Sequence, residues 1–249
     1  MMEHFDFSNN VRVVLVQPTH PGHIGGTARA MKTMCLGTLY LVNPGDYLGE
    51  EARARAGGAQ DVLLASKRCA SLQQALAGCR LVIGTSARTR SLRWPTLDPS
   101  IGAERLVAEA RHGPVALVFG REKTGLSNAE LDLCQYMVEI PSNSDYASLN
   151  LACAVQVMSY ELMRAQRKAG GQEESHGRDA SVPLARREDM ERFYRHLEEV
   201  LIESGFLDPA KPRRLMRRLY RLFNRACLDE NELNILRGIL TAVQQRWAK

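Results

Sequence analysis

Short apolar runs in the first two thirds of the chain predict the strands of a buried sheet. Each run is rich in β-branched residues and stops at a polar loop that contains glycine or proline. Continuous apolar runs of this length are typical of strands that are covered on both faces. The expected strands are 11–17, 38–42, 80–84, 115–119 and 136–140, with a possible further strand at 61–65.

Helical spacing of apolar residues appears between these runs. After the first run, apolar side chains recur at positions 24, 28, 31 and 35, which places them on one face of a helix. Further helices are expected at 50–58, 71–77 and 101–110, and a long one from about 149 to 166. Strands that alternate with helices at short spacing predict an α/β fold with a mostly parallel sheet.

The last third of the chain has a different pattern. Glycine, serine and charged residues without apolar periodicity predict a flexible linker at 168–184. Three helical patterns follow, at 185–204, 211–226 and 230–247, and in the second Leu215, Leu219 and Leu222 share a face. We therefore divide the chain into a sheet domain at 1–167, the linker, and a small all-α helical domain at 185–249.

The ligand of such a sheet is expected outside the carboxyl ends of the strands. Three loops should converge there, at 85–87, 120–122 and 141–148. A helix carrying Arg29 follows the first strand, and Gly22, Gly25 and Gly26 lie near the azimuth of this arginine. The spacing is compatible with a cation beside an unobstructed ligand surface, and equally with a surface arginine on a glycine-weakened helix.

The basic excess of the chain lies in its last third. The net charge is +5, of which residues 166–249 contribute +4 (17 Lys+Arg against 13 Asp+Glu). The segment Lys211–Arg225 has seven basic residues and no acidic one, which favours an anionic partner. We prefer nucleic acid to a membrane surface, because the apolar face of this helix is expected in the helical core. The candidate RNA-binding residues are Lys211, Arg213, Arg214, Arg217, Arg218 and Arg221.

A second basic group lies in the loop after the strand at 80–84. Arg88, Arg90 and Arg93 surround Trp94, which the pattern leaves exposed. Such a loop is either simply solvated or contacts RNA, with arginines on phosphates and the indole stacked on a base. We include the three arginines among the candidate RNA-binding residues.

Several classes of protein are disfavoured. No apolar stretch approaches the 18 residues that a membrane helix needs, and the N-terminus lacks a signal-peptide pattern, so we expect a cytoplasmic protein. The six cysteines form no CxxC pair, and most lie in apolar runs, so we expect buried, reduced thiols. The histidines show no ligand spacing, so no metal site is expected.

Three stretches carry a family resemblance. They are PGHIGGTARAMKTMCLGTLYLVNP at 21–44, LVFGREKTGLSNAEL at 117–131 and IPSNSDYASLNLACAVQVMSYEL at 140–162. Together, in this order, they resemble the three motifs of the SPOUT-class RNA 2′-O-ribose methyltransferases of the SpoU/TrmH branch. The length, the REKTGLS sequence and the helical tail are most similar to the TrmJ-type tRNA methyltransferases.

The resemblance implies a fold, a cofactor and a substrate. The sheet domain would end in a trefoil knot, which periodicity does not predict. S-adenosylmethionine would bind at the three strand-end loops, and the knotted domains would pair in a homodimer. The expected reaction is 2′-O-methylation of the cytidine or uridine at nucleotide 32 in the tRNA anticodon loop. Methylation of another RNA, such as rRNA, is the alternative.

The resemblance also implies site residues. Arg29, Glu122, Ser148 and Asn150 match catalytic positions. His23 stands where the family often has asparagine, and an imidazole offers one donor or acceptor at a time where an amide offers both. The candidate cofactor-binding residues are Thr85, Ser86, Ala87, Gly120, Ile140, Ala147, Ser148 and Leu149.

Two other functions deserve comparison when the residues are considered without the resemblance. One is an oxidoreductase with a nucleotide cofactor and a doubly wound sheet, but PGHIGG after the first strand lacks the GxGxxG spacing. The other is an RNA-binding protein without enzymatic activity. This second alternative explains the basic tail and leaves the GRE and SLN loops unexplained.

Overall fold

A single parallel sheet organises the computed structural model, which describes residues 7–86, 94–143, 148–170, 183–210 and 214–247. Within this part of the chain, seven strands lie in the order β3-β2-β1-β6-β4-β7-β5. Each neighbouring pair is parallel. The strands are β1 (Val11–Val16), β2 (Thr38–Val42), β3 (Lys67–Cys69), β4 (Leu81–Thr85), β5 (Thr96–Leu97), β6 (Val115–Phe119) and β7 (Tyr136–Val138).

Helices cover both faces of the sheet. Alternate strand residues such as Val13 and Leu117 face one layer, whereas Val14 and Val118 face the other, and all four are fully buried. The first layer contains α2 (Pro21–Thr33), α3 (Glu50–Ala56), α4 (Gln60–Leu64), α6 (Pro99–Ala110) and α8 (Leu151–Ala169). The second contains α5 (Leu72–Leu76) and α7 (Asn128–Leu131), and the short α1 (Phe7–Asn10) precedes β1. The expected α/β class with a mostly parallel sheet is confirmed.

One expected strand is wrong, and two short strands were missed. Residues 61–65 lie mostly in the helix α4, where Val62 and Leu63 are buried and Leu64 is 60% exposed. A short apolar run cannot be assigned to strand or helix from its periodicity alone. The strand in this region is β3, which pairs with β2 and contains two basic residues, Lys67 and Arg68.

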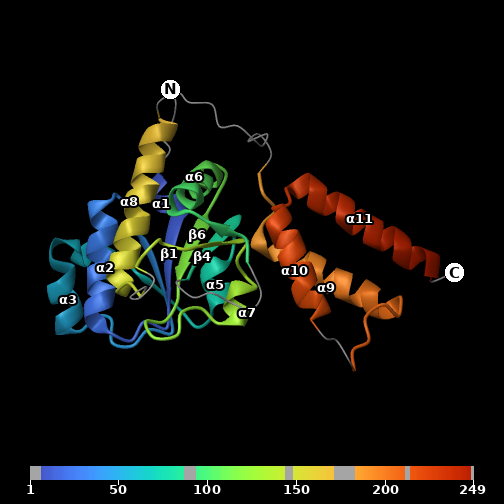
Figure 1. The fold of residues 1–249 in the computed structure, drawn as a ribbon, viewed down its shortest axis with the longest axis horizontal. Helices are drawn as coiled ribbons and strands as arrows, with labels where there is room; N and C mark the ends of the chain where they lie inside the picture. The colour runs from blue at the N-terminus through green and yellow to red at the C-terminus, as the bar shows by residue number, and fades with distance from the viewer. Residues whose placement is uncertain (1–6, 87–93, 144–147, 171–182, 211–213, 248–249) are drawn as a thin grey trace.

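Three helices form a separate cluster beside the sheet (Figure 1). They are α9 (Arg187–Glu203), α10 (Leu215–Ala226) and α11 (Glu230–Trp247), close to the expected ranges. Their core is built around Phe193 and Tyr194, against which Leu219 and Phe223 of α10 pack. Leu222 was expected in this core but is 46% exposed, because Leu219 and Phe223 form the packing face instead.

Polar contacts attach this helical cluster to the sheet domain. Arg80, at the start of β4, is buried and donates to the backbone carbonyls of His112, at 3.0 Å, and Leu184. The same guanidinium pairs with Glu230 of α11 at 3.1 Å. The backbone N–H of Arg187 donates to the carbonyl of Cys79 at 3.1 Å. The helical residues therefore dock on the sheet domain through defined hydrogen bonds, near the N-terminal end of β4.

A second group of contacts comes from α10. Arg217 pairs with Asp132 at 3.1 Å and lies 5.8 Å from the centre of the Trp94 ring. Asn224, which is buried, donates to the backbone carbonyl of Asp132 at 3.1 Å. These contacts fix the orientation of α10 relative to the sheet.

Replacing Arg80 tests this docking. The substitution Arg80→Met would leave the buried carbonyl of Leu184 without its donor, so we expect the free energy of unfolding to fall by about 2–3 kcal/mol. Urea denaturation followed by circular dichroism measures the change. The exposed Arg68 provides the matched control, and Arg68→Met should change stability by less than about 0.5 kcal/mol. Equal effects of the two substitutions would contradict the docking role.

Candidate active site

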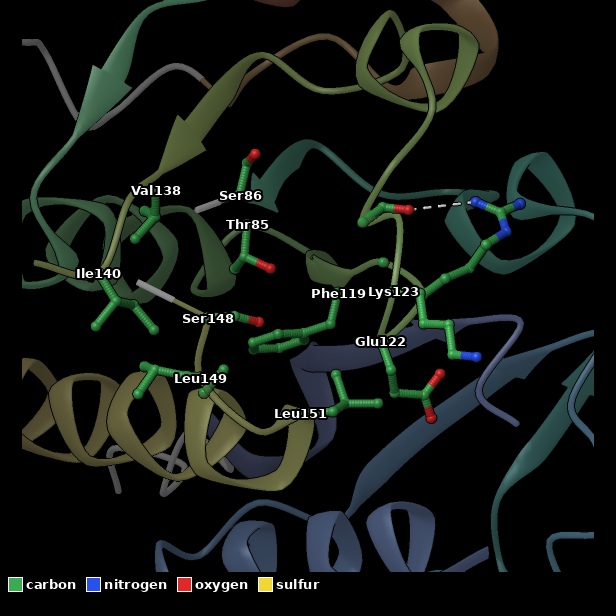
Figure 2. A pocket seen from close by; sticks show the side chains of 14 residues that line it. Thr85, Ser86, Phe119, Glu122, Lys123, Val138, Ile140, Ser148, Leu149 and Leu151 are labelled. Carbon is green, nitrogen blue, oxygen red and sulfur yellow. Dashed lines mark hydrogen bonds between the residues drawn. The ribbon is translucent and has the colours of Figure 1, made fainter. Parts of the chain in front are cut away.

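A cavity of about 300 Å³ opens where the carboxyl ends of β4, β6 and β7 approach the start of α8 (Figure 2). Its apolar wall consists of Phe119, Val138, Ile140, Leu149, Leu151 and Ala154. Polar groups come mainly from Thr85, Ser86, Arg121, Glu122, Lys123 and Ser148. An apolar wall with a few polar groups suits a small organic ligand that is held in one orientation.

The loop after β6 is folded tightly against itself at the cavity wall. The backbones of Arg121 and Gly125 exchange two hydrogen bonds, of 2.9 and 3.3 Å. Gly125 has a φ of +67°, in the left-handed region that favours glycine. At Gly120, a Cβ would lie 2.2 Å from backbone atoms of Gly125 and Leu126. Only glycine fits at position 120 without moving this backbone.

An ion pair supports the same loop from outside. The guanidinium of Arg121 binds both carboxylate oxygens of Glu130 at 2.9 Å, and its Nε donates to the side chain of Gln17 at 2.6 Å. Glu130 also accepts from the N–H of Ser127 and closes a capping box at the start of α7. Burial alone raises the pKa of Glu130, but these hydrogen bonds outweigh it and hold the pKa below its ordinary value.

The carboxylate of Glu122 joins the loop after β6 to the start of α2. It accepts from the backbone N–H groups of Thr19 at 3.2 Å and His20 at 3.3 Å, and lies 3.4 Å from Nδ1 of His23. Burial raises the pKa of Glu122, but hydrogen bonds from three backbone N–H groups and from His23 lower it below its ordinary value overall. The side chain is therefore a negative charge at neutral pH.

The first residues of α8 meet the same region. The side-chain oxygen of Asn150 caps the helix by accepting from the N–H of Ala152 at 2.9 Å. The amide nitrogen of Asn150 lies 2.7 Å from Nε2 of His23. A polar connection thus runs from Asn150 through His23 to Glu122, across three segments that are far apart in the sequence.

The structure brings most of the predicted site residues together. Seven of them line the cavity: Thr85, Ser86, Gly120, Glu122, Ile140, Ser148 and Leu149. Asn150 adjoins it through the contacts above, and Ala87 and Ala147 lie outside the described residues. Arg29 is exposed on α2 and is not among the residues that line the cavity.

The surroundings of the glycines near Arg29 differ from the expected open ligand surface. A Cβ on Gly25 would lie 2.0 Å from the backbone oxygen of Ala52, and one on Gly26 would lie 3.0 Å from the Cβ of Ala152. These two glycines permit close packing of α2 on α3 and α8. They are therefore structural and do not form an open ligand surface.

The sequence did not reveal the roles of Arg121 and Glu130 at the cavity wall. A signal was available in the SNAE sequence at 127–130, because Ser-x-x-Glu is the pattern of a capping box at a helix start. Phe119, Lys123 and Val138 were also missed as lining residues. They belong to the strand ends and loops whose convergence the sequence did predict.

The candidate RNA-binding residues divide into three groups. Arg88, Arg90, Arg93, Lys211 and Arg213 lie outside the described residues. Arg214 and Arg218 are exposed, and Arg221 is half-buried. Arg217 is paired with Asp132, so this arginine contributes to docking.

Trp94 was expected to be exposed, and this expectation is wrong. The residue is 7% exposed, and its indole N–H donates to the backbone carbonyl of Cys134 at 3.2 Å. The indole fills the second core layer beside Met137, so it cannot stack on a base. Trp94 therefore contributes to core packing and not to RNA contact.

The six cysteines lie at both buried and exposed positions. All six cysteines are free thiols, although Cys35 and Cys153 are exposed, contrary to the expectation of burial. Burial raises the pKa of Cys79 and of Cys134 to about 12.

Among the described residues, no group of three or more His, Cys, Asp or Glu side chains could hold a metal ion. None of the helices in the described ranges is long and apolar enough to cross a membrane.

Family models match both parts of the chain. The model described as the SpoU rRNA Methylase family matches residues 10–160, which is more than half of the chain and includes the cavity. The chain belongs to the SpoU methylase family. The model described as the tRNA methyltransferase TrmJ, C-terminal domain, matches residues 188–249, which contain the helical cluster.

Relatives within the SpoU methylase family align with nearly the whole chain. A tRNA (cytidine/uridine-2′-O-)-methyltransferase TrmJ of Photorhabdus laumondii is 52% identical and covers 96% of this chain and 98% of its own length. The crystal structure of TrmJ from Z. mobilis ZM4 has a TM-score of 0.77 at 29% identity and covers 94% of this chain and 98% of its own. A SpoU methyltransferase, AviRb from Streptomyces viridochromogenes, in complex with the cofactor AdoMet, has a TM-score of 0.50 at 25% identity and covers 64% of this chain and 61% of its own.

The tight loop after β6 generates a prediction. In Gly120→Ala, the new methyl group would collide with backbone that cannot rotate away, so we expect a loss of about 1–3 kcal/mol in the free energy of unfolding, measured by urea denaturation. A Cβ on Gly58 has no neighbour within 4 Å, so Gly58→Ala is the control and should be neutral or slightly stabilising. Unchanged stability of Gly120→Ala would show that the loop does not need glycine there.

Proposed function

We propose that this chain is an S-adenosylmethionine-dependent tRNA methyltransferase. Its reaction is 2′-O-methylation of the ribose of the cytidine or uridine at nucleotide 32 in the anticodon loop. The observation that carries the proposal is the convergence of Thr85, Gly120, Glu122, Ser148 and Leu149 on one cavity at the strand ends. Relatives with about half of their residues identical are named as tRNA (cytidine/uridine-2′-O-)-methyltransferases.

The cavity fits the proposed cofactor in size and chemistry. Ile140, Val138 and Leu149 offer an apolar surface for the adenine ring, and Thr85, Ser86 and Ser148 offer hydroxyl groups for polar atoms of the nucleoside. The bound cofactor supplies an activated methyl group on a sulfonium. A structure of an AdoMet complex within the SpoU methyltransferases supports this assignment.

The residues of the chain perform the remaining chemistry. A methyl transfer to a ribose hydroxyl requires the 2′-oxygen to be held in line with the reacting carbon and its proton to be transferred. A guanidinium offers N–H donors and no acceptor for a proton, so Arg29 does not act as the general base. We therefore assign it to orienting the hydroxyl and the neighbouring phosphate and to stabilising the developing alkoxide charge.

The proposal includes a knotted chain and a homodimer. In the knot, the segment after β7 passes through a preceding loop, and the position of β7 between β4 and β5 in the sheet is compatible with this path. Leu149, just before α8, exposes 40% of its surface and Tyr160, on α8, exposes 47%. The helix α8 packs beside α2. Pairing of two copies along this surface would cover these side chains and bring Arg29 of one copy toward the cavity of the other.

The proposed domain division assigns 1–167 to catalysis, 168–184 to a linker and 185–249 to tRNA binding. The two family models, which end at residue 160 and begin at residue 188, support this division. The separate core around Phe193 supports it as well. Arg214, at the N-cap of α10, and Arg218, on α10, are exposed and give the helical domain a basic surface for tRNA phosphates.

Incubation with labelled S-adenosylmethionine and unmodified tRNA tests the function. The proposal predicts label in tRNA and, by mass spectrometry of nuclease fragments, a 2′-O-methyl group at nucleotide 32. Label in rRNA would support the alternative RNA substrate, and RNA binding without transfer would support a non-enzymatic RNA-binding protein. Failure to bind S-adenosylmethionine would contradict the proposed cofactor and with it the proposed reaction.

Replacing Arg29 separates catalysis from cofactor binding. Since Arg29 is exposed and outside the cavity, we expect Arg29→Ala to abolish turnover and to leave the affinity for S-adenosylmethionine within a few-fold. Single-turnover methylation and titration calorimetry measure the two effects. The conservative Arg29→Lys keeps the charge without the planar fork and should restore only part of the rate. Lost cofactor binding in Arg29→Ala would contradict this role.

The basic surface of α10 predicts salt-dependent tRNA binding. Arg218→Glu should weaken tRNA binding, and the slope of log affinity against log salt should fall by roughly 1. Filter binding at several salt concentrations measures both. Arg55 is exposed on α3, and Arg55→Glu serves as a control with the same change of charge. Equal weakening by the two substitutions would show that only net charge matters.

A further inference from the structure

His23 lies between two of the proposed catalytic residues and contacts both. Its Nδ1 is 3.4 Å from the carboxylate of Glu122, and its Nε2 is 2.7 Å from the amide nitrogen of Asn150. The side chains of His23 and Glu122 expose only 24% and 16% of their surface. The imidazole therefore joins the loop after β6 to the start of α8 through both of its ring nitrogens.

The cap of α8 fixes the direction of these hydrogen bonds. The side-chain oxygen of Asn150 accepts from the N–H of Ala152 at 2.9 Å, so the amide NH₂ is the group that faces His23. An NH₂ group can only donate, so Nε2 of His23 must be an unprotonated acceptor. Nδ1 then carries the proton, and this N–H donates a hydrogen bond to the carboxylate of Glu122. This geometry selects a single state of His23, the neutral Nδ1–H tautomer.

Protonation of His23 would break one of the two contacts. An imidazolium has N–H donors on both nitrogens, and Nε2–H would then face the NH₂ of Asn150 at 2.7 Å. Two donors cannot share that distance, so the imidazolium and Asn150 must separate. The contact with Glu122 would survive, because a carboxylate accepts from either form of the ring.

We propose that neutral His23 is a positioning residue that holds Asn150 in its active orientation, and that protonation of His23 releases Asn150 and lowers the rate of methyl transfer. The inference rests on the proposed function for its kinetic part. Its structural part, the tautomer and the link to Asn150, stands on the hydrogen bonds alone. Ser148 and Leu149, which line the cavity, directly precede Asn150 in the chain.

Several groups from neighbouring elements face His23 or lie close to it. Glu122 favours the charged form and Asn150 favours the neutral form. His20 stacks on His23 with ring centroids 4.6 Å apart, and its own Nδ1 lies 3.7 Å from Glu51 of α3. A second imidazole thus lies beside the first, and the experiment must separate the two.

Nitrogen NMR on the full chain tests the structural part. In protein labelled with ¹⁵N in histidine, the proposal predicts that His23 at pH 8 has its proton on Nδ1 and a bare Nε2. His23→Asn identifies the signal by its loss. In Asn150→Ala the ring loses its donor, so the preference for the Nδ1–H tautomer should weaken. A dominant Nε2–H tautomer in the unmodified protein would overturn the proposal.

The pH dependence of methyl transfer tests the kinetic part of the proposal. In the unmodified enzyme, kcat should fall about tenfold per pH unit on the acid side, where His23 becomes protonated. His23→Asn replaces the ring with an amide that does not titrate, so this acid limb should disappear while activity at neutral pH stays within a few-fold. His23→Ala should lower kcat at every pH and leave KM for the cofactor nearly unchanged.

The variant His20→Asn is the matched control, and it should keep the acid limb. An unchanged acid limb in His23→Asn, or its loss in His20→Asn alone, would overturn the role of His23. Failure of the proposed function would look different, because no variant and no pH would then give methyl transfer to tRNA. In that case the NMR measurement still confirms or contradicts the link between His23 and Asn150.

Discussion

The ionised carboxylate of Glu122 is the constraint on which the candidate active site depends. It holds the start of α2, through Thr19, His20 and His23, against the loop after β6. A half-buried charge is stable only when donors replace the water it has lost, and the backbone N–H groups provide them. The same contact places His23 where it can meet Asn150 at the start of α8.

The loop that presents Glu122 is itself held rigidly. Gly120 allows the backbone to fold onto Gly125, and the pair of Arg121 with Glu130 supports the loop from its outer side. Both reduce the freedom of a loop that would otherwise have to be ordered on binding, at a cost in conformational entropy.

The docking of the helical cluster bears on how a large substrate is recognised. Asp132 lies just after α7 and receives both Arg217 and Asn224 from α10. One basic side chain is thereby used to fix the orientation of α10, while Arg214 and Arg218 remain exposed. The basic face of α10 thus keeps a set position relative to the cavity, as the proposed binding of tRNA at both places requires.

How much the sequence predicted depends on the kind of interaction. Four strands, β1, β2, β4 and β6, were predicted correctly because buried parallel strands are continuous apolar runs. The loops that follow the carboxyl ends of the strands then predicted the position of the cavity. The burial of Trp94 and the pairing of Arg217 were not found, because both depend on partners, Cys134 and Asp132, that are distant in sequence. Residues 61–65 were wrongly predicted as a strand, because a run of three apolar residues is compatible with the period of a strand and with that of a helix.

Photochemical cross-linking of labelled S-adenosylmethionine, followed by peptide mapping, locates the proposed cofactor site directly. A cofactor bound at the strand ends predicts label in peptides that contain the cavity residues of the loop after β6 and the segment before α8. This label should be lost when excess unlabelled S-adenosylhomocysteine competes. Label confined to the helical residues 183–247, or label that resists competition, would contradict the placement of the cofactor at the strand ends.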